Sequence, residues 1–403
     1  MKTILFLGAG TEHQIAIKLA KKMGYRVVAA DANSKAPGLK FADVAVVDDI
    51  KDIDKMTKVG RKYKVDGVTA HAVEIPHIVS RVAKNLNLPG IDPKIADRTT
   101  FKYERIKSLK DAGINVPSFK IVTSLKQAIK AASEIGYPVV IKPTDNAGAR
   151  GVKKVENKSE LDTAFVESLK FTKRPTILVE QYLEGIEIST ESLVSGGKIY
   201  TTGFGDRNYT RNNEFYPYFV EDGHNVPSVL SEEVVNKVIK EMEKAINALG
   251  ITWGVAKGDI LIHKKKIYII EMASRTSGGW FCAGTVPLAT GVHILKSLIR
   301  MSVDDPIDER DLKPSKHLAA CQRYIIPVQS GKFERLEGIG IARKMPGVKM
   351  LVIFGLPKKG EQIHKATNHA ERVGQIITVG KNVQDATSKC ERAIKKIKII
   401  FSK

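Results

Sequence analysis

The amino-acid sequence predicts a multidomain protein that combines α/β and α+β structure, and three observations support this prediction. Its 403 residues are too many for one compact core and suit two to four domains. The first part of the chain alternates short apolar strands with helices, which is the rhythm of a parallel sheet. Further along, the pattern changes to a larger α+β unit and then to a β-rich stretch with a terminal amphipathic helix.

The N-terminal region shows the most regular alternation of predicted strands and helices. Residues 4–7 and 26–30 have the apolar character of buried strands, and residues 12–23 between them have the spacing of an amphipathic helix. Further short strands at 43–47 and 65–70 and another helix at 75–85 continue the pattern. We therefore expect a Rossmann-like α/β domain over residues 1–95, with helices covering a parallel sheet.

The rest of the chain divides into three more parts. After one helix over about 100–112, residues 118–183 alternate strands and helices around a glycine loop. A long helix follows, with Ser231 as its N-cap, Gly250 past its end and apolar residues at a period of 3.6. A charged linker is expected near 304–316. The predicted domains after the first are 96–183, 184–310, and a small separate β-rich unit at 311–403.

Composition excludes several classes of protein. The chain is 43% apolar and 27% charged, which is typical of a folded protein, and it contains no apolar stretch long enough to span a membrane. Its first residues lack the long apolar segment and cleavage site of a secretory signal, so we expect a cytoplasmic protein without a membrane partner. The widely spaced Cys282, Cys321 and Cys390 form neither a disulfide framework nor a zinc motif.

The net charge of +21 is the one bulk property that points toward nucleic acid. However, the lysines are spread along the whole chain, and no arginine-rich arm or basic-aromatic stripe concentrates them. We therefore expect small-molecule substrates and no nucleic-acid partner.

A predicted hairpin provides the most informative chemical feature. Residues 258–263 and 267–271 form two strands, and a turn centred on Lys265 places Asp259 directly opposite Glu271 on the same face. Such neighbours lie roughly 5 Å apart at Cβ, and two like charges placed so are destabilising unless a cation bridges them. Two hard oxygen ligands suit Mg²⁺. The alternative is a register slip that leaves one carboxylate in solvent.

Two further motifs fit a nucleotide. A strand at 138–142 ends in Lys142 and leads into the loop 144–152, in which small residues and glycines let backbone N–H groups approach phosphate oxygens. Taken alone, an ordinary hairpin turn explains this loop equally well. The apolar strand 177–182 and its polar hinge could accommodate a nucleobase, with the nearby Glu187 left for ribose hydroxyls.

The order of these motifs resembles the ATP-grasp superfamily over nearly the full chain. Matching segments are Phe101-Lys102 before a helix, VVIKP at 139–143, AGARG at 147–151, VEQYLEGIE at 179–187, and EMASR at 271–275. The resemblance implies a two-lobed ATP-grasp fold. Two departures stand out, because Phe101 replaces a common aspartate and Ala273 replaces an asparagine that serves many relatives as a metal ligand.

The resemblance also implies roles for individual residues. Asp259 and Glu271 would bind Mg²⁺ (or Mn²⁺), and Arg275 would face the transferred phosphoryl group, with Lys142 as a second catalytic cation. The residues that would bind ATP are Lys102, Lys142, Gly148, Arg150, Gly151, Glu180, Gln181, Tyr182, Leu183 and Glu187.

Within the superfamily, three segments look like the L-amino-acid ligase branch. Glu221 and His224 match a carboxylate and a histidine that lie near the incoming amino acid in that branch, although His224 could equally be an ordinary loop histidine. Gly278, Gly279 and Trp280 resemble the segment that narrows the amino-acid pocket, with the tryptophan one position later than expected. The sequence ERVG at 371–374 is the third similar segment.

The expected function is therefore an ATP-dependent carboxylate–amine ligase that forms an acyl phosphate and then an amide from amino acids, and the resemblance also suggests a homodimer. Other ATP-grasp carboxylating or purine-ribotide ligases are the alternative. From different classes, an NAD-dependent oxidoreductase is indicated by Gly8, Gly10 and Asp31, although His13 stands where the third glycine of that fingerprint belongs. A non-catalytic nucleotide-binding regulator is the remaining alternative.

Overall fold

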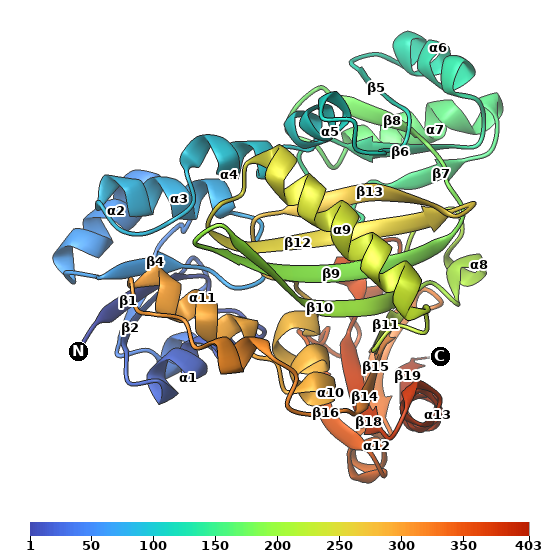
Figure 1. The fold of residues 1–403 in the computed structure, drawn as a ribbon. Coiled ribbons are helices and arrows are strands. Elements are labelled where there is room, and N and C mark those ends of the chain that lie inside the picture. Colours follow the sequence, from blue (N-terminus) through green and yellow to red (C-terminus); the bar gives the residue numbers. More distant parts are fainter. Residues whose placement is uncertain (403) are drawn as a thin grey trace.

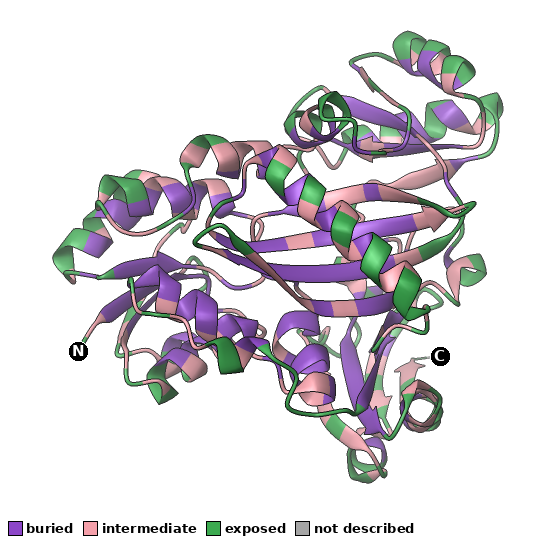
Figure 2. Ribbon diagram, viewed as in Figure 1, coloured by how far each residue is buried: buried purple, intermediate pink, exposed green. Residues whose placement is uncertain are grey.

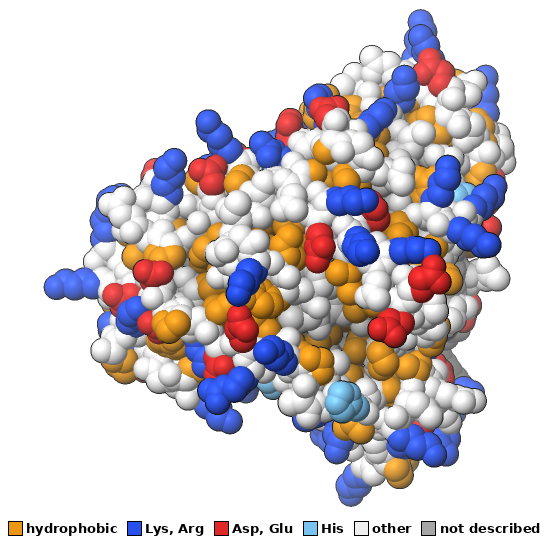
Figure 3. Space-filling model, in the orientation of Figure 1, with side chains coloured by type: hydrophobic (Ala, Val, Ile, Leu, Met, Phe, Trp, Pro, Cys, Tyr) orange, Lys and Arg blue, Asp and Glu red, His pale blue; other side chains and the backbone are white. Residues whose placement is uncertain are grey.

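The computed structural model describes residues 1–402 and confirms the multidomain α/β and α+β architecture. Figure 1 shows the N-terminal domain beside the edge of a large central sheet, a small lobe above that sheet, and the C-terminal strands below it. Among the residues that the structure describes, no helix is long and apolar enough to cross a membrane. On the face shown in Figure 3, Lys and Arg are interspersed with acidic residues and form no continuous basic stripe.

The N-terminal domain contains the predicted parallel sheet, in the strand order β3-β2-β1-β4. Its central strand β1 is buried along its whole length, because helices cover both faces of the sheet. The elements are β1 (Thr3–Leu7), α1 (Gln14–Lys22), β2 (Arg26–Asp31), η1 (Leu39–Phe41), β3 (Val44–Val47), α2 (Ile53–Lys62), β4 (Gly67–Thr69) and α3 (Pro76–Asn85).

Two helices, rather than one, connect this domain to the small lobe: α4 (Pro93–Thr100) and α5 (Lys102–Asp111). The predicted helix over about 100–112 is confirmed as α5, whereas α4 was not predicted. The Asp92 side chain accepts a hydrogen bond from the Lys94 N–H and Pro93 occupies the first turn, which together begin α4. Phe101 has extended backbone angles and separates the two helices.

The small lobe is a four-stranded antiparallel sheet in the order β5-β8-β6-β7. Helices α6 and α7 pack on it through the apolar residues of a separate core. Ser124 caps α6 by accepting a hydrogen bond from the Gln127 N–H. The elements are β5 (Phe119–Val122), α6 (Leu125–Ile135), β6 (Val139–Pro143), β7 (Lys153–Val155), α7 (Lys158–Leu169) and β8 (Ile177–Gln181).

An eight-stranded sheet, in the order β13-β12-β9-β10-β11-β14-β18-β16, forms the centre of the molecule. The strands and helices of the large lobe are β9 (Ile186–Ser195), β10 (Lys198–Asn208), α8 (Asn212–Phe215), β11 (Gly223–Val226), α9 (Glu232–Leu249), β12 (Gly254–His263) and β13 (Lys266–Ala273). After them come η2 (Phe281–Thr285), α10 (Val286–Thr290), α11 (Ile294–Ser302) and η3 (Glu309–Leu312).

The C-terminal strands extend this same sheet, because β11 pairs with β14. The expected separate unit is thus joined to the large lobe by backbone hydrogen bonds. A further small sheet has the order β17-β15-β19, and α13 packs beside β14 and β18. The elements are β14 (Ala319–Ile325), β15 (Gly331–Glu337), α12 (Ile339–Lys344), β16 (Val348–Ile353), β17 (Gln362–Ile363), η4 (His369–Glu371), β18 (Gly374–Gly380), α13 (Val383–Ile394) and β19 (Lys398–Phe401).

Helix α9 covers the apolar face of the central sheet, and the opposite face is polar. It lies across one face (Figure 1), where its apolar stripe packs on Ile188, Ala256, Ile260 and Ile269. Figure 2 shows buried and exposed positions alternating along α9, as expected for an amphipathic helix. Since strand residues alternate between faces, the odd-numbered residues of β9 and β12 point to the opposite side, as does Glu271 of β13, which pairs with Asp259.

The β12–β13 hairpin confirms the predicted pairing of Asp259 with Glu271, although by a different route. The turn is a tight two-residue turn at Lys264 and Lys265, which have φ of 47° and 63°. That turn alone would place Asp259 opposite Ile270. A β-bulge between Asp259 and Ile260 shifts the register by one residue and restores the pair of carboxylates.

We predict that the double substitution Lys264→Asn and Lys265→Gly in this turn stabilises the protein. Both positions have left-handed backbone angles, which Asn and Gly adopt at lower cost than Lys, so the gain should be about 1 kcal/mol. The thermal unfolding temperature should rise by about 2 to 4 °C. Lys266→Asn, on the adjoining strand, is the control and should give no gain; an unchanged double variant would contradict the prediction.

Candidate active site

The polar face of the central sheet carries a row of charged residues on three adjacent strands. Asp259 pairs with Ser189 of β9 on one side and with Glu271 of β13 on the other, and Lys257 pairs with Glu191 and Ala273 in the same way. Paired residues of an antiparallel sheet lie on the same face. The backbone register therefore assembles the predicted metal carboxylates, without requiring any loop to place them.

Cations surround the two carboxylates. Arg207 Nη1 lies 2.8 Å from Asp259 Oδ2, and the Lys257 ammonium forms an ion pair with the same carboxylate. Burial alone would raise the pKa of Glu271, but Lys257, Arg105 and Lys102 hold it well below its ordinary value. Glu271 is thus ionised, and the only ion pair within 4 Å found for it among the described residues is with Arg105, at 3.8 Å.

This arrangement fits a divalent cation. The Glu271 side chain remains 27% exposed and points to the same face as Asp259, so two hard oxygen donors are available side by side. Within the described part of the chain, no group of three or more His, Cys, Asp or Glu residues could hold a metal ion. Mg²⁺ bound here would therefore complete its coordination with water and phosphate oxygens, as Mg²⁺ commonly does.

Two lysines of other elements approach these carboxylates. Burial lowers the pKa of Lys102 to about 8, while Glu271 opposes this effect, so the Lys102 ammonium lies close enough to interact with that carboxylate. Lys102 also donates to the Asn146 carbonyl of the glycine loop. Lys142, at the end of β6, forms a nearly buried ion pair with Glu180 of β8. The structure thus brings together the predicted phosphate-binding lysines and the metal carboxylates.

The glycine loop at 144–152 covers this region and touches the C-terminal unit. Gly148, Ala149 and Gly151 all have left-handed backbone angles, with φ of 68°, 60° and 72°. The Gly148 carbonyl accepts a hydrogen bond from the His369 N–H, at 3.0 Å. Arg150 is exposed and donates to the carbonyl of Ala147 within the loop. The loop is therefore joined by hydrogen bonds to Lys102 on one side and to the C-terminal unit on the other.

The predicted adenine segment lies at the end of β8. The Glu180 carboxylate forms an ion pair with Lys142, so any contact between Glu180 and the adenine base would come from the Glu180 backbone. Gln181 pairs with Val139, Tyr182 lies under the Lys154 ammonium at 4.0 Å from the ring centre, and Leu183 is buried. Glu187 lies on β9, 3.7 Å from Arg207, and burial raises its pKa to about 7. These roles remain predictions.

Arg207 connects the metal carboxylates to the predicted substrate residues. Its Nη2 lies 2.9 Å from Glu221 Oε2, while its Nη1 binds Asp259. Burial would raise the pKa of Glu221, but His224 and Arg207 hold it well below its ordinary value. Glu221 is therefore an ionised carboxylate that is almost fully buried, and Arg207 connects it to the predicted metal-binding carboxylate Asp259.

His224 is fixed between two partners. Its Nε2 lies 2.9 Å from Glu221 Oε1, and its Nδ1 lies 3.1 Å from Gln322 Oε1. The Gln322 amide nitrogen donates to the Gly279 carbonyl and to Gln375, which fixes the orientation of that amide. Both ring nitrogens of His224 consequently face acceptor oxygens. The interpretation of His224 as an ordinary loop histidine does not account for this direct contact with Glu221.

The N-terminal domain closes the other side of the site. Arg275 Nε donates to Glu74 Oε2 at 2.5 Å, and Asp259 and Glu271 both attract its guanidinium. Glu12 accepts hydrogen bonds from the backbone N–H groups of Gly279 and Trp280, at 2.9 and 2.7 Å. The carboxylates Glu12 and Glu74 therefore tie the segment after β13 to the N-terminal domain.

Gly278, Gly279 and Trp280 reach this site through their backbone. The Trp280 ring is buried in an apolar cluster and stacks on Phe354, with ring centres 5.3 Å apart and an interplanar angle of 6°. That position places the ring among core residues, away from the carboxylates of the cleft. The substrate role of this segment remains a prediction, and its backbone contacts with Glu12 are the part that the geometry shows.

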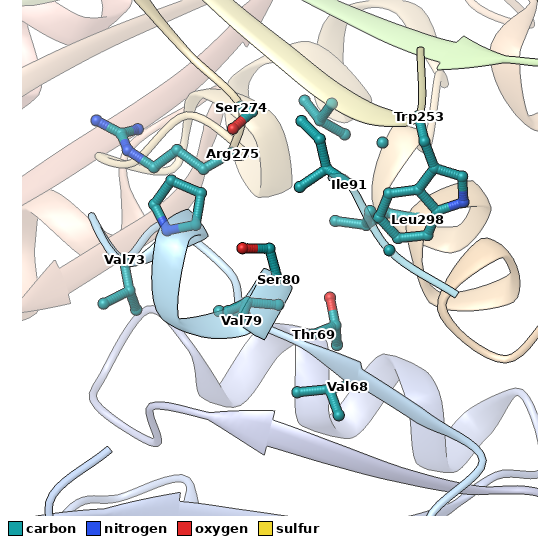
Figure 4. Close-up of a pocket in the computed structure, with 15 residues that line it drawn as sticks. Val68, Thr69, Val73, Val79, Ser80, Ile91, Trp253, Ser274, Arg275 and Leu298 are labelled. Carbon is teal, nitrogen blue, oxygen red and sulfur yellow. The ribbon is translucent and has the colours of Figure 1, made fainter. Parts of the chain in front are cut away.

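A cavity of about 50 Å³ lies nearby, between the N-terminal domain and the start of β12 (Figure 4). Apolar side chains line most of it, including Val68, Val79, Ile91 and Leu298, and Arg275 stands at its edge. Figure 4 shows the Arg275 guanidinium directed away from the Trp253 end of the cavity. The cavity has room for only a few water molecules, so it is not a nucleotide site.

Several residues of the site were missed at the level of sequence. Lys257 and Glu191 carried no motif, Arg372 lay in the ERVG segment without an assigned role, and Arg207 stood out only as the first residue of a basic-aromatic stretch at 207–218. Arg372 stacks on Tyr324 and donates to the Glu221 carbonyl. The available signal was alternation at the start of β9, where Glu187 and Ser189 alternate with Ile186 and Ile188.

The NAD alternative loses its structural basis at the β1–α1 loop. The Gly10 N–H, which a pyrophosphate would need, is bonded to His13 Nδ1 at 2.9 Å. Asp31 accepts the N–H of Ala9 and of Asn33, so its carboxylate fixes the loop. The residues that suggested a dinucleotide fingerprint therefore have other partners.

Comparisons with protein families cover almost the whole chain. A family described as the ATP-grasp domain matches residues 99–279, the L-amino acid ligase C-terminal domain 2 matches residues 323–402, and a PylC-like N-terminal domain matches residues 4–77. The central match contains the carboxylate pair, both lysines and the glycine loop.

Individual proteins are similar at low identity. The uncharacterized protein y4rH of Sinorhizobium fredii is 26% identical over 86% of this chain and 70% of its own length. A formate-dependent phosphoribosylglycinamide formyltransferase of Sulfolobus acidocaldarius is 25% identical over 97% of this chain and 96% of its own. The L-amino acid ligase structure from Bacillus licheniformis matches with a TM-score of 0.84 at 21% identity, over 100% of this chain and 99% of its own, which establishes the fold.

We predict that Glu12 makes stability depend on pH. Burial raises the pKa of Glu12 from 4.5 to about 7, so between these values the folded chain holds a proton that the unfolded chain has released. Raising the pH through this range destabilises the folded state by up to about 1.4 kcal/mol per pH unit. The unfolding temperature of the wild type relative to Glu12→Gln should therefore fall from about pH 5 to about pH 8. The exposed Glu134→Gln is the control; a constant difference for Glu12→Gln would contradict the prediction.

Proposed function

Because the chain belongs to the ATP-grasp superfamily, whose members use ATP to form C–N bonds, we propose that it joins the carboxylate of one amino acid to the amine of another. The observation that carries this proposal is the arrangement around Arg207. One face of one sheet holds a metal-binding carboxylate pair, and the same guanidinium connects that pair to the buried Glu221–His224 pair.

The reaction would proceed in two steps. A carboxylate oxygen of the first substrate attacks the terminal phosphorus of ATP, the bond to the bridging oxygen breaks, and ADP leaves with that electron pair. Lys142, Lys102 and Arg275 orient the phosphate oxygens and offset their charge. Bound Mg²⁺, held by Asp259 and Glu271, would supply further positive charge and orient ATP.

In the second step, the amine of the second substrate attacks the acyl carbon. The C–N bond forms, the C–O bond to the phosphoryl group breaks, and inorganic phosphate leaves. The attacking amine must lose a proton, and the ionised Glu221 beside His224 is the group placed to orient it or accept that proton. The glycine loop, resting on His369, would exclude water from the reactive acyl phosphate.

Charges on the walls of the cleft support amino-acid substrates. Glu221, between β10 and β11, is an ionised carboxylate that could attract the ammonium group of an amino acid. The match of residues 323–402 to the L-amino acid ligase C-terminal domain agrees with this choice. We therefore infer that the second substrate enters as an amine near Glu221.

A purine-ribotide ligase is the second candidate, and its support is the full-length similarity to the formate-dependent phosphoribosylglycinamide formyltransferase. A ribotide carries a phosphate, which requires free cations in the cleft. Here Arg207 binds Asp259 and Glu221, Arg275 binds Glu74, and Arg372 binds the Glu221 carbonyl. This use of the arginines favours the amino-acid assignment.

We predict that Glu271→Gln lowers ATP-dependent phosphate release by about 10²-fold or more, because the neutral amide is a poor ligand for Mg²⁺ and removes a charge from the pair. Phosphate release should be measured at saturating ATP, with circular dichroism to confirm the fold. Glu134→Gln, on the exposed side of α6, is the matched control. Full turnover in Glu271→Gln would remove the metal assignment.

A substrate screen distinguishes the two candidate ligases. Phosphate release should be measured with single amino acids, with pairs of amino acids, and with formate plus phosphoribosylglycinamide. We expect release to require two amino acids, and mass spectrometry to detect a product whose mass is the sum of the two less one water. Release with formate and phosphoribosylglycinamide alone would replace the amino-acid proposal with the ribotide one.

A further inference from the structure

Lys257 is an unexpected member of the carboxylate row. It lies two positions before Asp259 on β12, so both side chains project from the same face. Its ammonium forms an ion pair with Asp259 Oδ2, and its side chain is only 12% exposed. Glu271 is the cross-strand partner of Asp259 on that face. The Lys257 ammonium therefore lies beside the predicted metal-binding carboxylate pair.

The neighbours of Lys257 offer no other ligand at this position. On β13 its cross-strand partner is Ala273, which has no polar side-chain atom. On β9 its partner is Glu191, and Glu191 Oε1 accepts the Ser277 N–H at 2.6 Å. The oxygen donors that face the phosphate region are thus the two carboxylates Asp259 and Glu271, with a fixed positive charge beside them.

We propose that the Lys257 ammonium takes the place of a second divalent cation, so that this site binds one Mg²⁺ per nucleotide; the inference rests on the proposed nucleotide chemistry. Carboxylate pairs that act on phosphoryl groups often share two metal ions, which lie about 3.5 to 4 Å apart. Lys257 occupies that second position with a compact point charge and three N–H donors. A second metal ion would meet its repulsion and would find no unshared carboxylate.

The ammonium can also perform the electrostatic task of the ion that it replaces. Its three N–H donors point in different directions, so one can donate to a terminal phosphate oxygen while another keeps the ion pair with Asp259. Lys257 is part of a sheet strand, so its charge is always present, whereas a metal ion must first bind from solution. Turnover should therefore need a single divalent ion in addition to the protein.

The test counts metal ions directly. Mn²⁺ binding should be measured by electron paramagnetic resonance in the presence of a saturating non-hydrolysable ATP analogue, for the wild type, Lys257→Met and Lys257→Arg. We expect one Mn²⁺ per chain in the wild type and in Lys257→Arg. In Lys257→Met we expect two, with the spin coupling of neighbouring ions. Phosphate release by Lys257→Met should fall about 10²-fold at low Mg²⁺ and recover in part at high Mg²⁺.

Lys265→Met, on the exposed turn of the same hairpin, is the control and should bind one Mn²⁺ with unchanged turnover. Two Mn²⁺ ions in the wild type, or one in a folded Lys257→Met, would overturn the inference. Absence of Mn²⁺ binding in every protein would overturn it together with the metal assignment. Failure of the amino-acid screen alone would leave the metal count intact, so the two proposals fail separately.

Discussion

The structure depends on holding two like charges side by side. Asp259 and Glu271 are cross-strand partners on one face of the central sheet, and at about 4 Å their repulsion is on the order of 4 kcal/mol at an effective dielectric constant of about 20. A β-bulge, which shifts the hairpin by one residue, is needed to create this pairing. The surrounding cations Arg207, Lys257 and Arg105 offset the repulsion and come from three different elements. The β-bulge and the charges that offset the repulsion therefore lie together around Asp259 and Glu271.

Arg207 makes the two halves of the proposed reaction interdependent. Its guanidinium binds Asp259 through Nη1 and Glu221 through Nη2, both at hydrogen-bonding distance. Binding of Mg²⁺ and nucleotide at Asp259 would weaken the first contact and leave Arg207 freer to interact with Glu221 and substrate. The proposed amine site is thus electrostatically linked to the proposed ATP site. This linkage suits a ligase, because an acyl phosphate formed before the amine arrives is lost to water.

The sequence predicted most of the fold and part of the site, and the difference has a physical cause. The parallel N-terminal sheet, the helix between Ser231 and Gly250 and the partners Asp259 and Glu271 were predicted from local patterns, although Ser231 makes no side-chain capping hydrogen bond and a β-bulge sets the carboxylate pair. The start of α4 at Pro93 was missed although Asp92 and Pro93 together form a helix start. Arg372 and Glu12 could not be predicted, because their roles depend on contacts between segments that lie far apart in the chain. The joining of the C-terminal strands to the central sheet is of the same kind, since it is fixed by pairing between β11 and β14.

The candidate site is built from residues of several domains. The N-terminal domain contributes Glu12 and Glu74, the small lobe contributes the glycine loop, and the C-terminal unit contributes Arg372 and His369. His369 provides a backbone N–H to Gly148 and places its Nε2 3.4 Å from the Glu221 backbone nitrogen. One residue thus contacts both the loop over the nucleotide region and the backbone of the proposed substrate carboxylate. A small lobe that swings away would lose the contact with His369, so loop closure and the geometry around Glu221 are physically coupled. The arrangement explains why the C-terminal strands are hydrogen-bonded into the central sheet, because a loosely attached unit could not hold His369 in this position.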